Sequence, residues 1–208
     1  MSQLFSVRIF FIILPFAFGY CASAKGKCIE GECENGSGKM EMESRSIYEG
    51  SFASGAREGL GKLSFPNQDG FEGTYLNNSK NGPGIYRYAN GQIFEGQYVN
   101  DVRNGLGKYL YSDKEIFEGN YSEGIRDGEG VYIYPNGDRF EGLYKDGKRN
   151  GPGKYIFKDK NLLEGNWKDN LLEGKAVIKN PKGGLILEGY WKNNEYMGIN
   201  PPDTTESN

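Results

Sequence analysis

Histidine is absent from all 208 residues, which removes the most common general base and the most common zinc ligand of proteins. Without histidine no Ser-His or Cys-His pair can form. The sequence also has no glycine-rich loop that ends in Lys-Ser or Lys-Thr, as a phosphate-binding loop would. We therefore expect a protein that is not an enzyme, with no catalytic residues, no metal site and no cofactor.

Alanine and leucine, the usual residues of helices and cores, are scarce, whereas glycine and aromatic residues are abundant. The chain has 32 glycines, 15 tyrosines and 12 phenylalanines, and the glycine share is roughly twice the average. Such a composition favours a β-structure whose interior consists of aromatic rings lying over glycines. At this length we expect at most one or two domains.

One pattern recurs seven times along the chain. Its fixed point is a glutamate followed by glycine, and successive glutamates lie 23 or 24 residues apart: Glu49, Glu72, Glu95, Glu118, Glu141, Glu164 and Glu188. Three residues after each glutamate comes an aromatic residue: Phe52, Tyr75, Tyr98, Tyr121, Tyr144, Trp167 and Trp191. Ten residues after each glutamate comes a glycine. Two positions further on, the first five copies have a second glycine, and the last two have Ala176 and Asn200.

Each repeat reads as a β-hairpin. Residues 94–98 alternate with period two and predict a first strand, residues 100–105 predict a loop, and residues 108–111 predict a second strand. Residues 135–138 contain Asn-Gly, the strongest short hairpin signal, and predict the tight turn that leads to the next repeat.

The alternation also predicts one aromatic face. Phe94, Gly96 and Tyr98 point to one side of their strand, and Tyr109 and Tyr111 can join them from the second strand. Rings that stack from repeat to repeat stabilise a quasi-one-dimensional array. We therefore predict an all-β fold, an elongated single-layer antiparallel sheet of successive hairpins on the order of 65 Å long, because neighbouring strands lie about 4.8 Å apart.

The repeat, for example residues 117–132, resembles the MORN repeat. The resemblance covers about residues 47–199. It implies an elongated, curved antiparallel sheet, and it links the chain with phospholipid recognition, protein scaffolding and oligomerisation. The repeat does not decide between these functions.

Residues 1–24 have the pattern of a secretory signal peptide. Arg8 precedes the apolar run at residues 9–20, which is short for a membrane span, and a cleavage site follows that ends at Ala24. An uncleaved anchor, or a lipid attached through Cys21, is an alternative. We expect an exported protein, periplasmic or secreted. Removal of Arg8 leaves 24 basic and 28 acidic side chains, a net charge of −4, so we expect no nucleic-acid partner.

Residues 25–46 contain a shortened copy of the repeat and predict an N-terminal cap. In this cap Cys28 and Cys33 are disulfide candidates. In a regular strand their Cα atoms would lie about 16 Å apart, and a disulfide requires less than about 7 Å. The chain therefore either turns near Gly31 and forms the disulfide, or it stays extended with free thiols. Residues 47–199 form the repeat array, and residues 200–208 a polar tail.

Two sets of residues are candidates for binding a partner. A single-layer sheet cannot cover its aromatic face from both sides, so the rings either stay partly open to a protein partner or a second copy, or cover one another in a curved sheet. The ring candidates are Tyr75, Tyr98, Tyr121, Tyr144, Trp167 and Trp191. The open last strand near Trp191 could also pair with another chain.

The second set is a row of basic residues, eight positions after each glutamate in five repeats: Arg57, Lys80, Arg103, Arg126 and Arg149. We expect these residues in loops along one edge, about 10 Å apart. There they either bind phosphates or an anionic phospholipid surface, or are merely solvated. The repeated glutamates form a column rather than a unique constellation, so we interpret them as structural or solvated. Our main prediction is a protein-binding or self-associating scaffold, and the alternative is a phospholipid binder.

Overall fold

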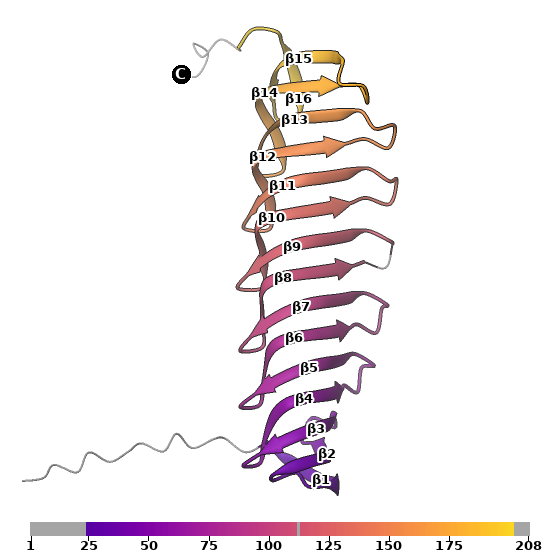
Figure 1. The fold of residues 1–208 in the computed structure, drawn as a ribbon, viewed down its shortest axis with the longest axis vertical. Helices are drawn as coiled ribbons and strands as arrows, with labels where there is room; N and C mark the ends of the chain where they lie inside the picture. Colours follow the sequence, from indigo (N-terminus) through magenta and orange to yellow (C-terminus); the bar gives the residue numbers. More distant parts are fainter. Residues whose placement is uncertain (1–23, 112, 202–208) are drawn as a thin grey trace, which may run out of the picture.

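A computed structural model describes residues 24–111 and 113–201, and these residues form one antiparallel sheet of sixteen strands in sequence order. Figure 1 shows the strands stacked along the long axis, with β1 at one end and β16 at the other. The strands are β1 (Gly26–Gly31), β2 (Gly36–Met42), β3 (Ile47–Ala53), β4 (Ala56–Ser64), β5 (Gly70–Leu76), β6 (Ser79–Arg87), β7 (Ile93–Val99), β8 (Val102–Leu110), β9 (Ile116–Ser122), β10 (Ile125–Ile133), β11 (Arg139–Lys145), β12 (Lys148–Ile156), β13 (Leu162–Lys168), β14 (Leu171–Lys179), β15 (Leu185–Lys192) and β16 (Glu195–Gly198). The all-β, single-layer prediction is confirmed.

The loop predicted at residues 100–105 is wrong, because most of it belongs to strand β8. Asn100 and Asp101 both have positive φ, 48° and 69°, as in the two-residue turns that match the twist of a hairpin. The strand therefore resumes at Val102. Gly105, at a φ of 93°, lies where the pairing of β7 with β8 shifts register, so the extra residues form a bulge within the strand.

The second glycine of each repeat has a different role, which is to let a ring lie against the backbone. A Cβ atom at Gly107 would lie 2.6 Å from the ring of Phe94. Gly107 is paired with Gly96 on one side and with Gly119 on the other. Such pairs continue from Gly31 to Gly165, so a column of glycines crosses the sheet.

The core consists of the rings that this glycine column admits. Phe94 is fully buried, and its ring contacts two others edge to face, Tyr98 of its own repeat at 5.6 Å and Tyr121 of the next at 5.2 Å. Phe71 and Phe117 make the same two contacts in their repeats. Each of the first five hairpins is thus joined to the next by an aromatic pair, an arrangement worth about 0.5–1.5 kcal/mol beyond the area buried.

The sixth repeat departs from this pattern at three positions. Leu163 replaces the phenylalanine, Ala176 the second glycine and Leu172 the basic residue, and all three are buried. Because a leucine side chain reaches less far than a phenylalanine ring, a methyl group fits at position 176. A Cβ at Gly165 would lie 2.7 Å from Ala176 and 2.8 Å from Leu172, so these two side chains occupy the space beside the glycine column in this repeat.

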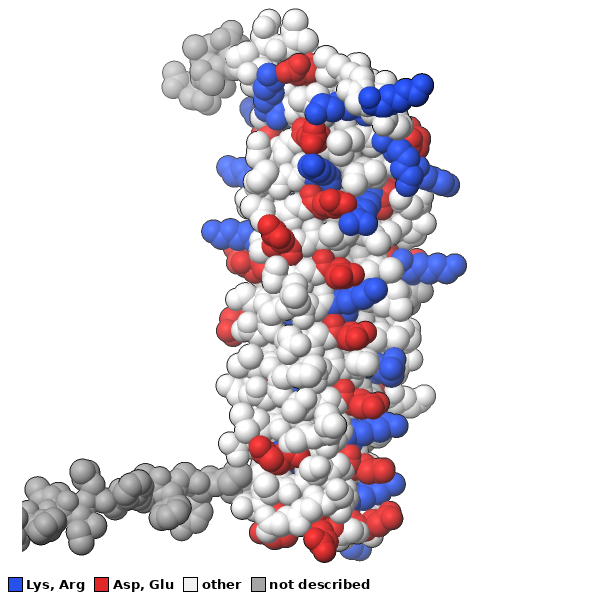
Figure 2. Space-filling model, in the orientation of Figure 1, with Lys and Arg blue, Asp and Glu red and all other residues white. Residues whose placement is uncertain are grey.

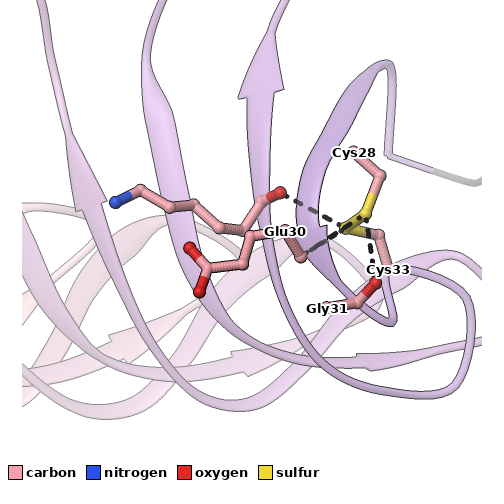
Figure 3. The surroundings of a disulfide bond; sticks show 5 residues. Cys28, Glu30, Gly31 and Cys33 are labelled. Carbon is pink, nitrogen blue, oxygen red and sulfur yellow. Dashed lines mark hydrogen bonds between the residues drawn. A yellow bond between two sulfur atoms is a disulfide. The ribbon is translucent and has the colours of Figure 1, made fainter.

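The cap forms a hairpin of β1 and β2 with a disulfide between Cys28 and Cys33 (Figure 3). The chain turns at Gly31, whose φ is 71°, and this turn brings the two Cα atoms to 5.9 Å. Of the two alternatives for this segment, the structure shows the one in which the chain turns and the disulfide forms. Cys33 is buried in the place that an aromatic ring occupies in the other repeats.

The predicted signal peptide lies outside the described residues except for Ala24, and of the predicted tail only residues 200 and 201 are described. None of the described residues belongs to a helix that is long and apolar enough to cross a membrane.

Candidate interaction surface

The six ring candidates are buried, with exposed fractions of 2–6%. Tyr75 touches the rings of Tyr48 and Phe71 at 5.1 and 5.5 Å, and Trp167 touches Phe140 at 5.0 Å. Burial raises the pKa of Tyr98 to about 12. The expectation that Tyr75, Tyr98, Tyr121, Tyr144, Trp167 and Trp191 form an open contact surface is therefore corrected, because these rings cover one another.

The basic row lies in strands and not in loops, so its predicted position is wrong. Arg57, Lys80, Arg103, Arg126 and Arg149 are the second residues of β4, β6, β8, β10 and β12. The two-residue turns place them there, since the second strand begins directly after the turn. All five are partly buried.

The cations of this row cover the ring core. The guanidinium carbons of Arg103 and Arg126 lie 4.4 Å from the ring centres of Phe94 and Phe117. Both arginines also donate hydrogen bonds to tyrosine hydroxyls, Tyr88 and Tyr111. Burial lowers the pKa of Arg126 from its ordinary value. These contacts give the row a structural role, and anion binding by it stays a prediction.

Outside the basic row, a ladder of half-buried rings closes this face of the sheet. Tyr109 and Tyr111 lie 4.4 Å apart, and Tyr111 and Tyr132 6.3 Å apart. Their hydroxyls are used within the fold: Tyr109 donates to Gln92 at 2.7 Å, and Tyr132 to Glu115 at 2.6 Å. The aromatic side of the sheet is thus largely occupied by its own contacts.

The opposite side of the sheet is hollowed above the glycine column. One stretch of this groove crosses β3 to β9 with a volume of about 920 Å³, and another crosses β10 to β13 with about 770 Å³. A smaller hollow between them, across β8 to β11, shares lining residues with both. We call the whole feature the glycine groove. Figure 2 shows acidic and basic side chains interspersed along the length of the molecule beside largely uncharged surface.

One wall of the glycine groove carries exposed apolar side chains, which alternate with polar residues such as Gln97 and Glu129 on the neighbouring strands. We call this row the apolar wall. Leu60, Pro83 and Leu106 stand one per repeat along β4, β6 and β8, and Leu60 and Leu106 are 74% and 66% exposed. In the second stretch Leu143 and Pro152 line the groove. Large apolar side chains in such a row mark an interaction site more often than single exposed ones do.

The other wall carries the repeated glutamates. Strand register places Ile85 between Glu72 and Glu95, with Lys62 and Lys108 on the outer sides of this trio. In the described part of the chain neither Glu72 nor Glu95 has an ion-pair partner, and Lys108 instead contacts Glu118 at 4.0 Å. Both carboxylates thus face solvent beside the apolar wall without a direct ion pair, each opposite a lysine of a neighbouring strand.

The apolar wall was missed by the reasoning from sequence, although its signal is present. Three residues of the wall each come eleven positions after a repeat glutamate, between the glycines at positions ten and twelve: Leu60, Pro83 and Leu106. A residue flanked by two glycines looks like part of a turn, whereas here it belongs to a strand. The described residues contain no cluster of acidic or cysteine side chains that could hold a metal ion.

Comparison with solved structures shows the same kind of fold. The TCP domain of SAS-4 (dCPAP) of Drosophila melanogaster, solved in complex with a proline-rich motif of Ana2 (dSTIL), is 15% identical with a TM-score of 0.53, and the match covers 91% of this chain and 98% of that one. The CPAP G-box domain is 12% identical with a TM-score of 0.50, covering 76% and 82%. No curated protein matches the sequence.

The repeat itself identifies the family. The MORN repeat matches residues 48–70, 71–93, 94–115, 117–139, 140–162 and 164–185, six consecutive copies. The seventh copy lies beyond this match and forms the hairpin of β15 and β16. The protein belongs to the MORN repeat family.

Proposed function

We propose that this protein is a non-enzymatic, exported scaffold that binds an extended segment of a partner protein in the glycine groove. The observation that carries the proposal is the exposed row of Leu60, Pro83 and Leu106 beside Glu72 and Glu95, which have no ion-pair partner among the described residues. The aromatic face is largely occupied by its own contacts, whereas the groove combines a hollow of about 920 Å³ with exposed leucines. The SAS-4 domain of similar fold was solved with a peptide motif of another protein, which supports a polypeptide partner.

A groove variant tests the proposal. Replacing Leu60 and Leu106 together by serine removes both leucines of the apolar wall in the stretch across β3 to β9, and because both side chains are exposed we expect folding to be unchanged. Recovery of a crosslinked partner from the native cell should fall at least tenfold. The matched control replaces Leu185 and Ile186, which are 61% and 53% exposed outside the groove, and should recover the partner normally. Equal recovery with both double variants would refute the groove as the binding surface.

Export has its own test. The expected cleavage after Ala24 predicts a mature protein that begins at Lys25. Mass spectrometry of the protein from the extracytoplasmic fraction should find this N-terminus with the Cys28–Cys33 disulfide formed, since an oxidising compartment maintains such bonds. A protein that keeps residues 1–24 and remains in the cytoplasm would contradict export.

Phospholipid binding through the basic row is the weaker alternative, because Arg103, Arg126 and Arg149 already contact rings and hydroxyls of the fold. Cosedimentation with anionic vesicles, with these arginines replaced by serine in a parallel sample, measures it directly. Self-association is a further alternative, for which light scattering across a concentration series is the measurement.

A further inference from the structure

The glycine groove is lined by more glutamates than lysines, but its glutamates are not equally paired. Glu49, Glu118, Glu141 and Glu164 have ion-pair partners, whereas Glu72, Glu95 and Glu129 have none among the described residues. The stretch across β3 to β9 is lined by four glutamates and two lysines, and the stretch across β10 to β13 by three glutamates and one lysine. Around Ile85 the exposed Glu72 and Glu95 have no cation within ion-pair distance in the described chain, although Lys62 and Lys108 stand opposite them on the outer neighbouring strands. Complementary charge selects partners and speeds their association, so the occupant that fits this groove is basic.

The lining of the groove recurs once per repeat, at a regular spacing along the sheet. Each repeat contributes two strands, which advance about 9.6 Å at roughly 4.8 Å per strand. A polyproline II helix rises 3.1 Å per residue with three residues per turn, or about 9.3 Å per turn. Residues three apart in a β-strand point to opposite sides. A polyproline II chain that runs across the strands therefore presents the same side to every repeat, and an extended β-strand does not.

The floor of the groove fits such a chain for a further reason. Gly73, Gly84 and Gly96 are paired with one another across three neighbouring strands, so their backbone groups are already engaged in the sheet. An occupant that adds a β-strand would find no free backbone partners here. A polyproline II chain has a fully solvated backbone and needs none.

We infer that the glycine groove binds a basic polyproline II segment of the partner, with lysine or arginine at every third position beside Glu72 and Glu95 and with proline or aliphatic residues against Pro83 and Leu106. This inference rests on the proposed function, because it names the chemistry of the segment that the scaffold holds. Glu72 and Glu95 lie on the same row of the sheet, two strands apart. That separation equals one turn of the bound chain.

Selection from a random 15-residue peptide display library on the purified protein tests the inference. Enriched peptides should be basic, with lysine or arginine recurring at every third position among proline and aliphatic residues. A synthetic probe of four Pro-Leu-Arg units should then bind at least tenfold more tightly than four Pro-Leu-Glu units. It should also bind tenfold more tightly than a peptide of the same composition whose arginines are adjacent.

Variants of the protein locate this binding. Replacing Glu72 and Glu95 together by glutamine should weaken the probe about tenfold, whereas Glu123→Gln, an exposed acid in a turn outside the groove, should change its affinity less than twofold. Enrichment of peptides without basic period-three residues, or equal binding of the three probes, would overturn the inference. If recovery of a native partner still requires Leu60 and Leu106 in that case, the proposed function stands, and only the inference of a basic polyproline II segment is refuted.

Discussion

Replacing Phe117 by alanine is expected to lower the free energy of unfolding by about 3–5 kcal/mol, the usual cost of emptying a buried phenylalanine site. The ring is fully buried and lies between Tyr121 at 5.5 Å and Tyr144 at 5.0 Å, with Arg126 above it at 4.4 Å. Its loss removes the contact that joins the fourth hairpin to the fifth. Urea unfolding followed by tyrosine and tryptophan fluorescence measures the change.

Hydrogen exchange shows whether Phe117→Ala destabilises its own hairpins locally or the whole sheet evenly. In a repeat array each unit contacts only its neighbours, so faster exchange should centre on β9 to β11 and fade towards β1 and β16. The control is Ile125→Ala in the same repeat, whose side chain is 49% exposed and whose loss should cost within about 0.5 kcal/mol. A cost below about 1 kcal/mol for Phe117→Ala would contradict the ring core.

Replacing Gly84 by alanine is expected to destabilise the protein by about 1–3 kcal/mol, the usual cost of overpacking. The added Cβ would lie 2.3 Å from the ring of Phe71 and 3.3 Å from a backbone oxygen of Glu72. The conservative control is Gly70→Ala, because a Cβ at Gly70 would meet nothing closer than 3.8 Å.

A double-mutant cycle gives the second part of this prediction. Phe71→Leu combined with Gly84→Ala reproduces the pair that the sixth repeat has at Leu163 and Ala176. The double variant should therefore be more stable than the sum of the two single changes predicts, with a favourable coupling of at least about 1 kcal/mol. Strictly additive costs would show that ring and glycine are not matched to each other.

The fold could be predicted from the sequence because the same hairpin pattern occurs seven times. Spacing of Glu, aromatic residue and glycine fixes hairpin length, and alternation places Phe94 and Tyr98 on one face. What the repeat could not separate were two roles of glycine. Gly105 forms a bulge and Gly107 admits a ring. From the sequence Gly105 reads as the end of the loop, so the predicted loop is too long and the predicted second strand begins too late.

That one error misplaced the basic row and concealed the apolar wall. With the loop reduced to Asn100 and Asp101, Arg103 moves from an edge into a strand above Phe94. The same shift places Leu106 in the strand, on the face opposite to the rings. Burial of Tyr98 could not be decided from alternation, because it depends on how far the neighbouring repeats curl over it.

The central claim is that a partner polypeptide binds in the glycine groove and not on the aromatic face. Photo-crosslinking of the full chain to the best peptide from the selection tests it, with benzoylphenylalanine placed either at Gln97, an exposed residue lining the groove, or at Tyr88 in the ring ladder. The account predicts a crosslinked product from Gln97 and none from Tyr88. A product from Tyr88 with none from Gln97 would contradict it.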